Sequence, residues 1–377
     1  MLPASRSEPL NLGDVMPSCV ASLRGKPNTL GLPAARKAVM VVIDGLGASM
    51  LASRRGHARN LISAFTKNSK IRAEFPTTTA ASLTTLLTGV QPGTHGMVGY
   101  SVLDPVNDVV RNQLTGWGAD MRPDTWQRSE TVFETTTDLP SFSVGPSRYA
   151  RSGFTEAVLR GSRYLSAESV DERCQTAREV LDEHPEALIY LYIPELDQLA
   201  HRFGWESDSW IRGLEDVDAS LARLAQSLRP DEGMLITADH GVVDVPARGH
   251  ILIDPASAYC DGVRHFAGEP RCAHLYFEPD ASPAVRAQVT QLWRATEGDR
   301  SDVLTRSEAI TRGWFGSTVD DEVMPRIGDL LVAPRKLIAY YRDAEDTVSA
   351  QSMIGQHGSR TDEESVVPLL RWGAYAR

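Results

Sequence analysis

The chain has 377 residues, of which 42% are hydrophobic and 23% are charged, and its formal net charge at pH 7 is −10. This composition is ordinary for a soluble globular enzyme, and the length suffices for one large α/β domain or for a domain with an insertion. The negative charge argues against a broad surface for nucleic-acid polymers. It does not exclude an anionic small molecule, because bound metal ions supply local positive charge.

The N-terminal residues and the cysteines bear on the location of the protein. Residues 1–23 lack the continuous apolar core of a signal peptide, and no stretch approaches the roughly 20 apolar residues of a membrane span. The four cysteines are sparse and show no Cys-x-x-Cys spacing, so we expect reduced thiols rather than a disulfide framework. The sequence therefore predicts a cytoplasmic protein that does not contact a membrane.

The first part of the chain alternates between strand and helix signals. Residues 1–36 are rich in Pro, Ser and Arg, which predicts an irregular arm lying over the main domain. Apolar runs and helical spacing then predict a strand at Ala38–Ile43, a helix at Ser49–Ser63, a strand at Lys70–Phe75 and a helix at Ala80–Gly89. Residues 91–150 carry many Gly, Pro and Asp residues without long periodicity, which favours substrate loops.

The second part repeats this alternation and then changes character. Helical spacing at 170–183 and 207–227 alternates with apolar runs at 188–193 and 234–237, which predicts a mainly parallel sheet flanked by helices. Residues 257–348 carry shorter strand signals and one helix near Pro283–Glu297, which predicts a smaller inserted α+β cap. The sequence thus predicts three parts: an arm at 1–36, a catalytic α/β domain formed by 37–256 and 349–377, and the cap.

Side chains typical of metal sites follow several of the apolar runs. They are Asp44 after the first strand, Asp197 and His201 after residues 188–193, Asp239 and His240 after residues 234–237, and His357 in a late Gly-Gln-His-Gly segment. Open α/β sheets bind ligands beyond the carboxyl ends of their strands, so we expect these side chains to converge. Zinc prefers Asp and His ligands. With a hydroxyl from the Thr-rich segment 75–82, they predict a two-metal hydrolytic site.

The order of these motifs resembles the type I phosphodiesterase/nucleotide pyrophosphatase family of the alkaline phosphatase superfamily. The resemblance covers about residues 38–250 and 350–372 and includes Pro76-Thr77-Thr78-Thr79, Leu87-Thr88-Gly89 and Pro92-Gly93-Thr94-His95-Gly96. It implies an alkaline-phosphatase-like fold, two divalent ions (zinc) and Thr79 as the nucleophile. The implied ligands are Asp197, His201 and His357 for one ion, and Asp44, Asp239, His240 and the Thr79 oxygen for the other.

Three positions leave alternatives open. Thr78 competes with Thr79 for the place of the nucleophile, and the alternative role for such a threonine is to cap the following helix. The family's nucleotide pyrophosphatases place an aromatic residue directly after the nucleophile, where this chain has Ala80. Tyr100 replaces an Asn that binds a phosphate oxygen in the family; its hydroxyl could bind substrate, or its ring could pack in the wall.

The leading prediction is a two-metal hydrolase that cleaves phosphodiester or pyrophosphate bonds of small, nucleotide-like substrates through a phospho-Thr79 intermediate. The alternatives are a phosphomonoesterase or a phosphonate hydrolase on the same scaffold, and a non-catalytic, metal-dependent binding protein. A sulfatase is disfavoured because the chain has no Cys-x-Pro-x-Arg or Ser-x-Pro-x-Arg motif.

Overall fold

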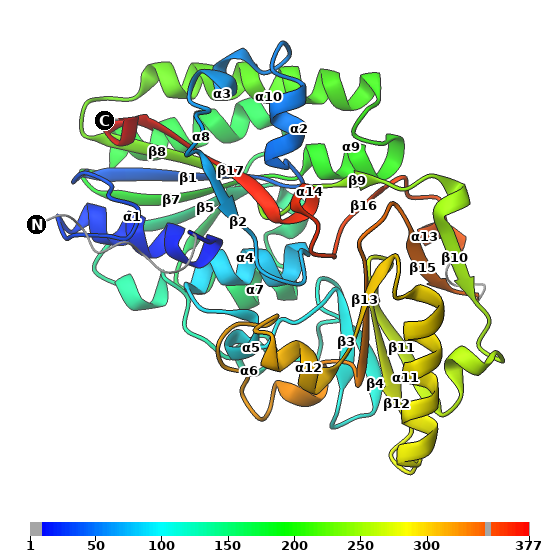
Figure 1. The fold of residues 1–377 in the computed structure, drawn as a ribbon. Helices are drawn as coiled ribbons and strands as arrows, with labels where there is room; N and C mark the ends of the chain where they lie inside the picture. The colour runs from blue at the N-terminus through cyan, green and yellow to red at the C-terminus, as the bar shows by residue number, and fades with distance from the viewer. Residues whose placement is uncertain (1–9, 344–347, 377) are drawn as a thin grey trace, which may run out of the picture.

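A mixed sheet of seven strands forms the centre of the molecule (Figure 1). The structure is a computed structural model that describes residues 10–343 and 348–376. The strand order is β2-β17-β8-β1-β7-β5-β6, and the five strands from β8 to β6 run parallel to one another, whereas β17 is antiparallel to both of its neighbours. The strands are β1 (Lys37–Ile43), β2 (Lys70–Arg72), β5 (Ser141–Gly145), β6 (Arg163–Ser166), β7 (Ala187–Ile193), β8 (Glu232–Thr237) and β17 (Val366–Gly373). The predicted α/β class with a mainly parallel sheet is therefore confirmed.

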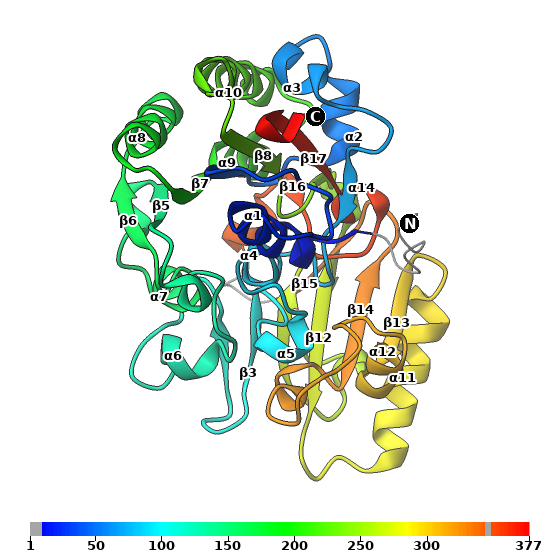
Figure 2. The same ribbon diagram turned by 90° about the vertical axis from the view of Figure 1, so that its left-hand side faces the viewer.

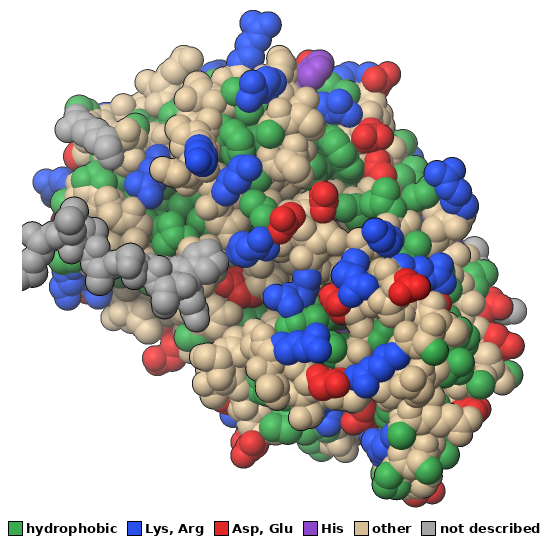
Figure 3. Space-filling model, in the orientation of Figure 1, with side chains coloured by type: hydrophobic (Ala, Val, Ile, Leu, Met, Phe, Trp, Pro, Cys, Tyr) green, Lys and Arg blue, Asp and Glu red, His purple; other side chains and the backbone are tan. Residues whose placement is uncertain are grey.

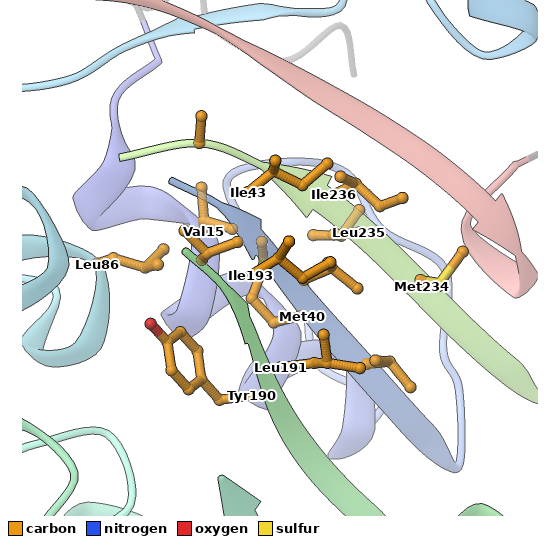
Figure 4. Close-up of a cluster of buried hydrophobic side chains, with 14 of the residues drawn as sticks. Val15, Met40, Ile43, Leu86, Tyr190, Leu191, Ile193, Met234, Leu235 and Ile236 are labelled. Atoms are coloured by element: carbon orange, nitrogen blue, oxygen red, sulfur yellow. The ribbon is translucent and has the colours of Figure 1, made fainter. Parts of the chain in front are cut away.

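Strand β1 lies at the middle of the sheet and is completely buried. All seven of its residues are buried, and it pairs with β7 from Lys37 to Ile43 and with β8 from Lys37 to Val42. Figure 4 shows Met40 and Ile43 of β1 among Leu191, Ile193 and Ile236 of the neighbouring strands. A strand that is apolar on both faces needs cover on both, which explains the continuous apolar run.

Helices cover the two faces of the sheet (Figures 1 and 2). On one face lie α2 (Ala48–Ser53), α3 (Arg59–Ser63), α8 (Val170–Glu183), α9 (Glu195–Phe203) and α10 (Asp208–Ser227). On the other lie α1 (Val15–Leu23), α4 (Thr79–Thr88) and α7 (Gly153–Val158). Ser169 and Ser207 cap the N-termini of α8 and α10 with their hydroxyls, which fixes where these helices begin.

Three local predictions need correction. Within the arm that was expected to be irregular, residues 15–23 form α1, whose Val15, Met16 and Cys19 are fully buried; Pro17 is tolerated because it lies in the first helical turn. The helix expected at 49–63 is two short helices, α2 and α3, interrupted around Gly56, a poor helix former. Residues 91–150, expected to be loops, also contain the sheet strand β5.

A second, smaller lobe is built around an antiparallel sheet of four strands in the order β11-β12-β14-β13. Its elements are β11 (Val263–Glu269), β12 (Cys272–Phe277), α11 (Pro283–Glu297), β13 (Ser301–Thr305), α12 (Arg306–Thr311) and β14 (Leu330–Pro334). The hairpin β3 (Ser101–Asp104) and β4 (Val109–Asn112) lies beside it, with α5 (Pro92–His95) and α6 (Pro123–Trp126) nearby. Met97 and Trp126 share a core with Cys272 and Leu304, so this lobe also draws on residues before 257; the predicted domain boundaries stay a prediction.

Short pairs of strands connect the two lobes. These are β10 (His250–Ile253) with β15 (Ala339–Arg342), and β9 (Val243–Asp244) with β16 (Gly355–Gln356). The helices α13 (Val348–Gln351) and α14 (Asp362–Ser365) lie in the same region of the chain. Within the described parts of the chain, no helix combines the length and the apolar character needed to cross a membrane. On the face drawn in Figure 3, basic and acidic side chains are interspersed around the middle of the molecule.

One fully buried ion pair ties the smaller lobe to the catalytic lobe. Arg271, in the turn between β11 and β12, makes two hydrogen bonds of 2.7 Å to the two carboxylate oxygens of Glu364 in α14. Its remaining donors bind the carbonyls of Lys336 and Ile338. Glu364 also accepts from the backbone N–H of Ser359, two residues after His357. The pair therefore holds the segment that carries His357.

We predict that Arg271→Ala lowers the free energy of unfolding by about 3–5 kcal/mol, because it leaves the buried carboxylate of Glu364 without its cation. Arg223→Ala is the matched control: Arg223 forms an exposed ion pair with Asp171, so its loss should cost less than about 1 kcal/mol. Urea unfolding followed by circular dichroism measures both. Equal effects of the two substitutions would contradict the assignment.

Candidate metal centre and active site

Six Asp and His side chains from four segments meet at the carboxyl edge of the central sheet. Asp44 directly follows β1, Asp239 and His240 follow β8, Asp197 and His201 lie in α9 after β7, and His357 follows β16. Strands β1, β7 and β8 are neighbours in the sheet, so residues far apart in the sequence come together. The structure thus brings together all six side chains that the sequence singled out.

The six side chains form two groups of three. Asp197, His201 and His357 make one group, and Asp44, Asp239 and His240 the other; within each group, one ligand atom per residue lies within 4.8 Å of the others. The rings of His240 and His357 stack with centroids 3.6 Å apart, so the two groups are adjacent.

The first group is held by the geometry of helix α9 and by the contact between His201 and the backbone carbonyl of Gly355. Asp197 and His201 are four residues apart in α9, and His201 Nε2 lies 3.2 Å from Asp197 Oδ2. His357 Nε2 lies 3.8 Å from Asp197 Oδ1, on the other side of the same carboxylate. This spacing of Nε2 and carboxylate oxygens leaves room for a shared cation rather than for direct hydrogen bonds to both histidines.

In the second group, His240 lies between two carboxylates. His240 Nε2 is 3.4 Å from Asp44 Oδ1 and 3.5 Å from Asp239 Oδ2. Asp239 Oδ1 accepts hydrogen bonds from the backbone N–H groups of Gly45 and His240, and Asp44 Oδ2 accepts one from the Tyr192 hydroxyl. One oxygen of each carboxylate is therefore used for orientation, and the other faces His240.

The oxygens that face inward support metal binding. Asp44 Oδ1, Asp197 Oδ1 and Asp239 Oδ2 are buried and have no hydrogen-bond partner among the described residues. A buried carboxylate oxygen without a partner costs free energy unless a cation neutralises it. Three such oxygens in one place, each with an imidazole nearby, are the donor set expected for two divalent ions.

The three histidines present the same nitrogen to the site. Nδ1 of His201 lies 2.7 Å from the carbonyl oxygen of Gly355. Nδ1 of His357 lies 2.8 Å from that of Thr77, and Nδ1 of His240 lies 3.3 Å from that of Gly241. A carbonyl can only accept, so Nδ1 carries the proton in each ring. Nε2 is then left with its lone pair, the form in which imidazole binds a metal.

The electrostatics of the site follow from burial and like charge. Burial, and then repulsion from Asp239 and Asp197, raise the pKa of Asp44 well above its usual value. Burial and repulsion from Asp197 raise the pKa of Asp239 to about 7. Burial also lowers the pKa of His240 well below its usual value, so this imidazole stays neutral. Without cations, the site therefore resists ionisation of Asp44 and Asp239, whereas at Asp197 the effect of burial is outweighed by His201, which lowers the pKa of that carboxyl group.

Two glycines permit the close approach of these segments. Gly45 has φ +74°, and a Cβ there would lie 3.0 Å from the Cβ of Asp197. A Cβ on Gly241 would lie 2.0 Å from the carbonyl oxygen of Glu363. Any larger residue at either position would push Asp44 or His240 out of the group, which explains Asp-Gly and Asp-His-Gly after the two strands.

Thr79 and Thr78 are separated by their contacts. Thr78 is the N-cap of α4, and its buried hydroxyl accepts from the N–H of Ala81 at 3.3 Å. Thr79 is the first residue of α4, and its Oγ1 lies 3.3 Å from His240 Nε2. The geometry thus gives Thr78 the cap and places the Thr79 hydroxyl beside the second group.

A chamber of about 430 Å³ opens onto the metal groups and onto Thr79. Asp44, Thr79 and Asp197 line one end, and Arg148, Tyr149 and Gln198 are also among the lining residues. Tyr100 does not line this chamber; it is 41% exposed, and its backbone N–H binds Glu269. The role expected for Tyr100 as a substrate contact stays a prediction.

Several residues of the site were not predicted from the sequence. Tyr192 orients Asp44, and Tyr190, Tyr149 and Arg148 line the chamber. The signal for the first two lay in the strand itself: Tyr190 and Tyr192 alternate, so they project on the same face, and both precede the strand's carboxyl end. Arg148 and Tyr149 carry no comparable signal, because they follow a strand that the sequence did not reveal.

The family of the chain follows from comparison of its whole length. A family model described as type I phosphodiesterase / nucleotide pyrophosphatase matches residues 38–360. The chain belongs to this family. The members are metal-dependent hydrolases, so the resemblance inferred from the motifs is confirmed.

Venom phosphodiesterase 2 of Crotalus adamanteus is 25% identical to the chain over 233 residues, which are 58% of this chain and 26% of that protein. The chain spans less than half of the length of the curated relatives that it matches.

Solved structures of two kinds share the fold of this phosphodiesterase-family chain. An inactive threonine-to-alanine variant of murine ectonucleotide pyrophosphatase/phosphodiesterase 5 in complex with AMP has a TM-score of 0.68 at 17% identity, over 90% of this chain and 88% of that one. Phosphonoacetate hydrolase from Sinorhizobium meliloti, in complex with phosphonoacetate, has a TM-score of 0.69 at 17% identity, over 90% and 91%. At this identity the likeness shows the fold.

We predict that metal binding by this family member releases protons below about pH 7. The pKa of Asp239 is about 7, so this carboxyl holds its proton in the metal-free protein at about pH 6, whereas a metal binds the carboxylate; burial and repulsion from Asp239 also raise the pKa of Asp44. Affinity for Zn²⁺ should therefore rise as the pH rises through the pKa of Asp239. Calorimetric titration in two buffers of different ionisation enthalpy counts the protons, and a count of zero would contradict this electrostatic account.

Proposed function

We propose that the chain is a two-metal hydrolase, with zinc as the metal, that cleaves phosphodiester or pyrophosphate bonds of small, nucleotide-like substrates through a covalent Thr79 intermediate. The observation that carries the proposal is the position of Thr79 Oγ1, 3.3 Å from His240 Nε2 and at the end of the chamber next to Asp44 and Asp197. Family membership supports the class of reaction.

Each residue of the site has a distinct role in the proposed reaction. Asp44, Asp239 and His240 would hold one ion with the Thr79 oxygen, and Asp197, His201 and His357 the other. The two ions would supply Lewis-acid stabilisation for a phosphoryl oxygen and for the ionised forms of the attacking and leaving oxygens. Thr79 would lose its proton to solvent and attack phosphorus, and the ester oxygen would leave with the electrons of the broken P–O bond and take up a proton. Water would then attack the phospho-threonine, the bond between phosphorus and the Thr79 oxygen would break, and Thr79 would take up a proton again while the attacking water loses one to solvent.

The N-terminus of α4 supports Thr79 in this role. Thr79 is the first residue of a helix of ten residues, where free backbone N–H groups and the helix dipole stabilise negative charge. Thr78 completes the helix end by capping it, which fixes the direction in which the Thr79 side chain leaves the backbone. In the murine neighbour, the variant that binds AMP carries alanine in place of a threonine and is inactive, which is the behaviour expected if a threonine is the nucleophile there.

We predict that Thr79→Ala lowers kcat for bis-p-nitrophenyl phosphate by at least about a thousandfold, because no other hydroxyl replaces the nucleophile. Thr78→Ala is the matched control. It removes the helix cap, so it should cost about 1 kcal/mol of stability and leave most of the turnover. Metal content, measured by mass spectrometry, should persist in both variants. Loss of turnover in the Thr78 variant alone would reverse the assignment.

Substrate preference separates the proposal from its alternatives. Turnover of bis-p-nitrophenyl phosphate well above that of p-nitrophenyl phosphate supports a diesterase. The opposite preference indicates a phosphomonoesterase, release of phosphate from phosphonoacetate indicates a phosphonate hydrolase, and metal binding without any turnover indicates a binding protein. The cytoplasmic location expected from the sequence stays a prediction.

A further inference from the structure

The chamber beside Thr79 has walls of an unusual kind for a site that handles phosphate. Six aliphatic side chains line it: Leu83, Leu87, Leu114, Val144, Val158 and Leu159. They come from α4, from the segment after β4, from β5 and from α7 and its end, and five of the six are buried. The rings of Phe154, Tyr164, Tyr190 and Tyr192 also line the chamber. The space next to the nucleophile is therefore mostly apolar.

The hydroxyl groups in these walls are largely used by the protein itself. The Ser152 hydroxyl caps α7, Tyr164 donates to the carbonyl of Pro146, and Tyr192 donates to Asp44. Gln198 donates to the Tyr149 hydroxyl. Tyr190 brings one further hydroxyl, on the side of the sheet where Figure 4 shows Leu86 of α4. A nucleobase carries several donors and acceptors, and burying them without partners is costly.

Arg148, Tyr149 and Thr115 are polar residues among those that line the chamber. The exposed Arg148 guanidinium lies 4.7 Å from the centre of the Tyr149 ring. Thr115 is exposed as well. A polar or anionic arm of a substrate would find its contacts here, whereas an apolar arm gains free energy by entering the aliphatic part.

The size of the chamber also indicates that part of a ligand enters it. Protein interiors are close-packed, and voids larger than a water molecule are few. The chamber has a volume of about 430 Å³, and buried aliphatic side chains line much of it, so an apolar group that enters it displaces water from apolar surface. Its volume lies within the range of pockets that enclose small ligands.

From these walls, this size and the position of Thr79, we propose that the chamber receives a hydrocarbon arm of the substrate, so that the enzyme acts on phosphodiesters or pyrophosphates with one alkyl or plain aryl group. The inference rests on the proposed function, because the phosphoryl group must lie at Thr79 and the metal groups for its arm to reach the chamber. The second arm, nucleotide-like or otherwise polar, lies at Arg148 and Tyr149.

Alkylphosphonates test the chamber separately from the reaction. Methyl-, butyl-, hexyl- and octylphosphonate would be titrated as competitive inhibitors of bis-p-nitrophenyl phosphate turnover by the metal-loaded enzyme. Burial of each methylene should lower Ki about fourfold until the chamber is full. AMP and ribose 5-phosphate form the second pair of inhibitors: an apolar chamber predicts that the base adds little, so that their Ki values differ by less than about tenfold.

Two leucine variants test whether the dependence of Ki on alkyl chain length arises in this chamber. Leu114→Gln places an amide in the wall at a half-buried position and should reduce the ratio of the methylphosphonate Ki to the octylphosphonate Ki about tenfold or more. Leu337→Gln, at a leucine that is 54% exposed and outside the chamber, should leave the ratio unchanged.

The outcomes separate the two proposals. A Ki that does not depend on chain length, or a large gain from the nucleobase with a flat alkyl series, overturns the hydrocarbon arm while turnover still supports the hydrolase. A ratio that falls equally in both leucine variants overturns the assignment to this chamber. Absence of turnover on every ester would instead refute the proposed function, and direct calorimetric binding of the alkylphosphonates would still report on the chamber.

Discussion

Three carboxylates buried side by side, Asp44, Asp197 and Asp239, are the constraint around which this structure is arranged. Each turns one oxygen inward without a hydrogen-bond partner among the described residues. Repulsion among buried carboxylates is relieved either by protonation or by bound cations. The electrostatics of the site therefore favour metal binding, independently of any likeness to other proteins.

The same constraint accounts for features that extend beyond the ligands. Gly45 and Gly241 remove the side chains that would separate the groups, and backbone carbonyls fix the proton on Nδ1 of all three histidines. Arg271, from the smaller lobe, binds Glu364 and so holds the segment after His357. The smaller lobe therefore contributes to the metal site through structure, because it supports a ligand without supplying one.

The sequence indicated the candidate ligands because most of them are signalled locally. Asp44, Asp239 and His240 follow buried apolar strands, and Asp197 and His201 have the spacing of one helical turn. The choice between Thr78 and Thr79 needed coordinates, because both stand at the start of α4 and only the direction of each hydroxyl separates them.

The chamber could not be predicted, because its walls come from segments that carry no motif. Its strand β5, with the sequence Ser-Phe-Ser-Val-Gly, lacks a continuous apolar run, and Arg148 and Tyr149 follow it closely. Helix α1 was missed for a related reason: Pro17 reads as a helix breaker unless its place in the first turn is known. Local patterns thus indicate the chemistry, whereas packing between distant segments decides which substrate arm fits.

The most direct test of the two-metal account is X-ray diffraction from crystals of the Zn²⁺-loaded protein at wavelengths on both sides of the zinc edge. The account predicts two anomalous peaks about 4 Å apart, one bounded by Asp197, His201 and His357 and the other by Asp44, Asp239, His240 and the Thr79 oxygen. A single peak, or no peak beside Asp239 and His240, would contradict it.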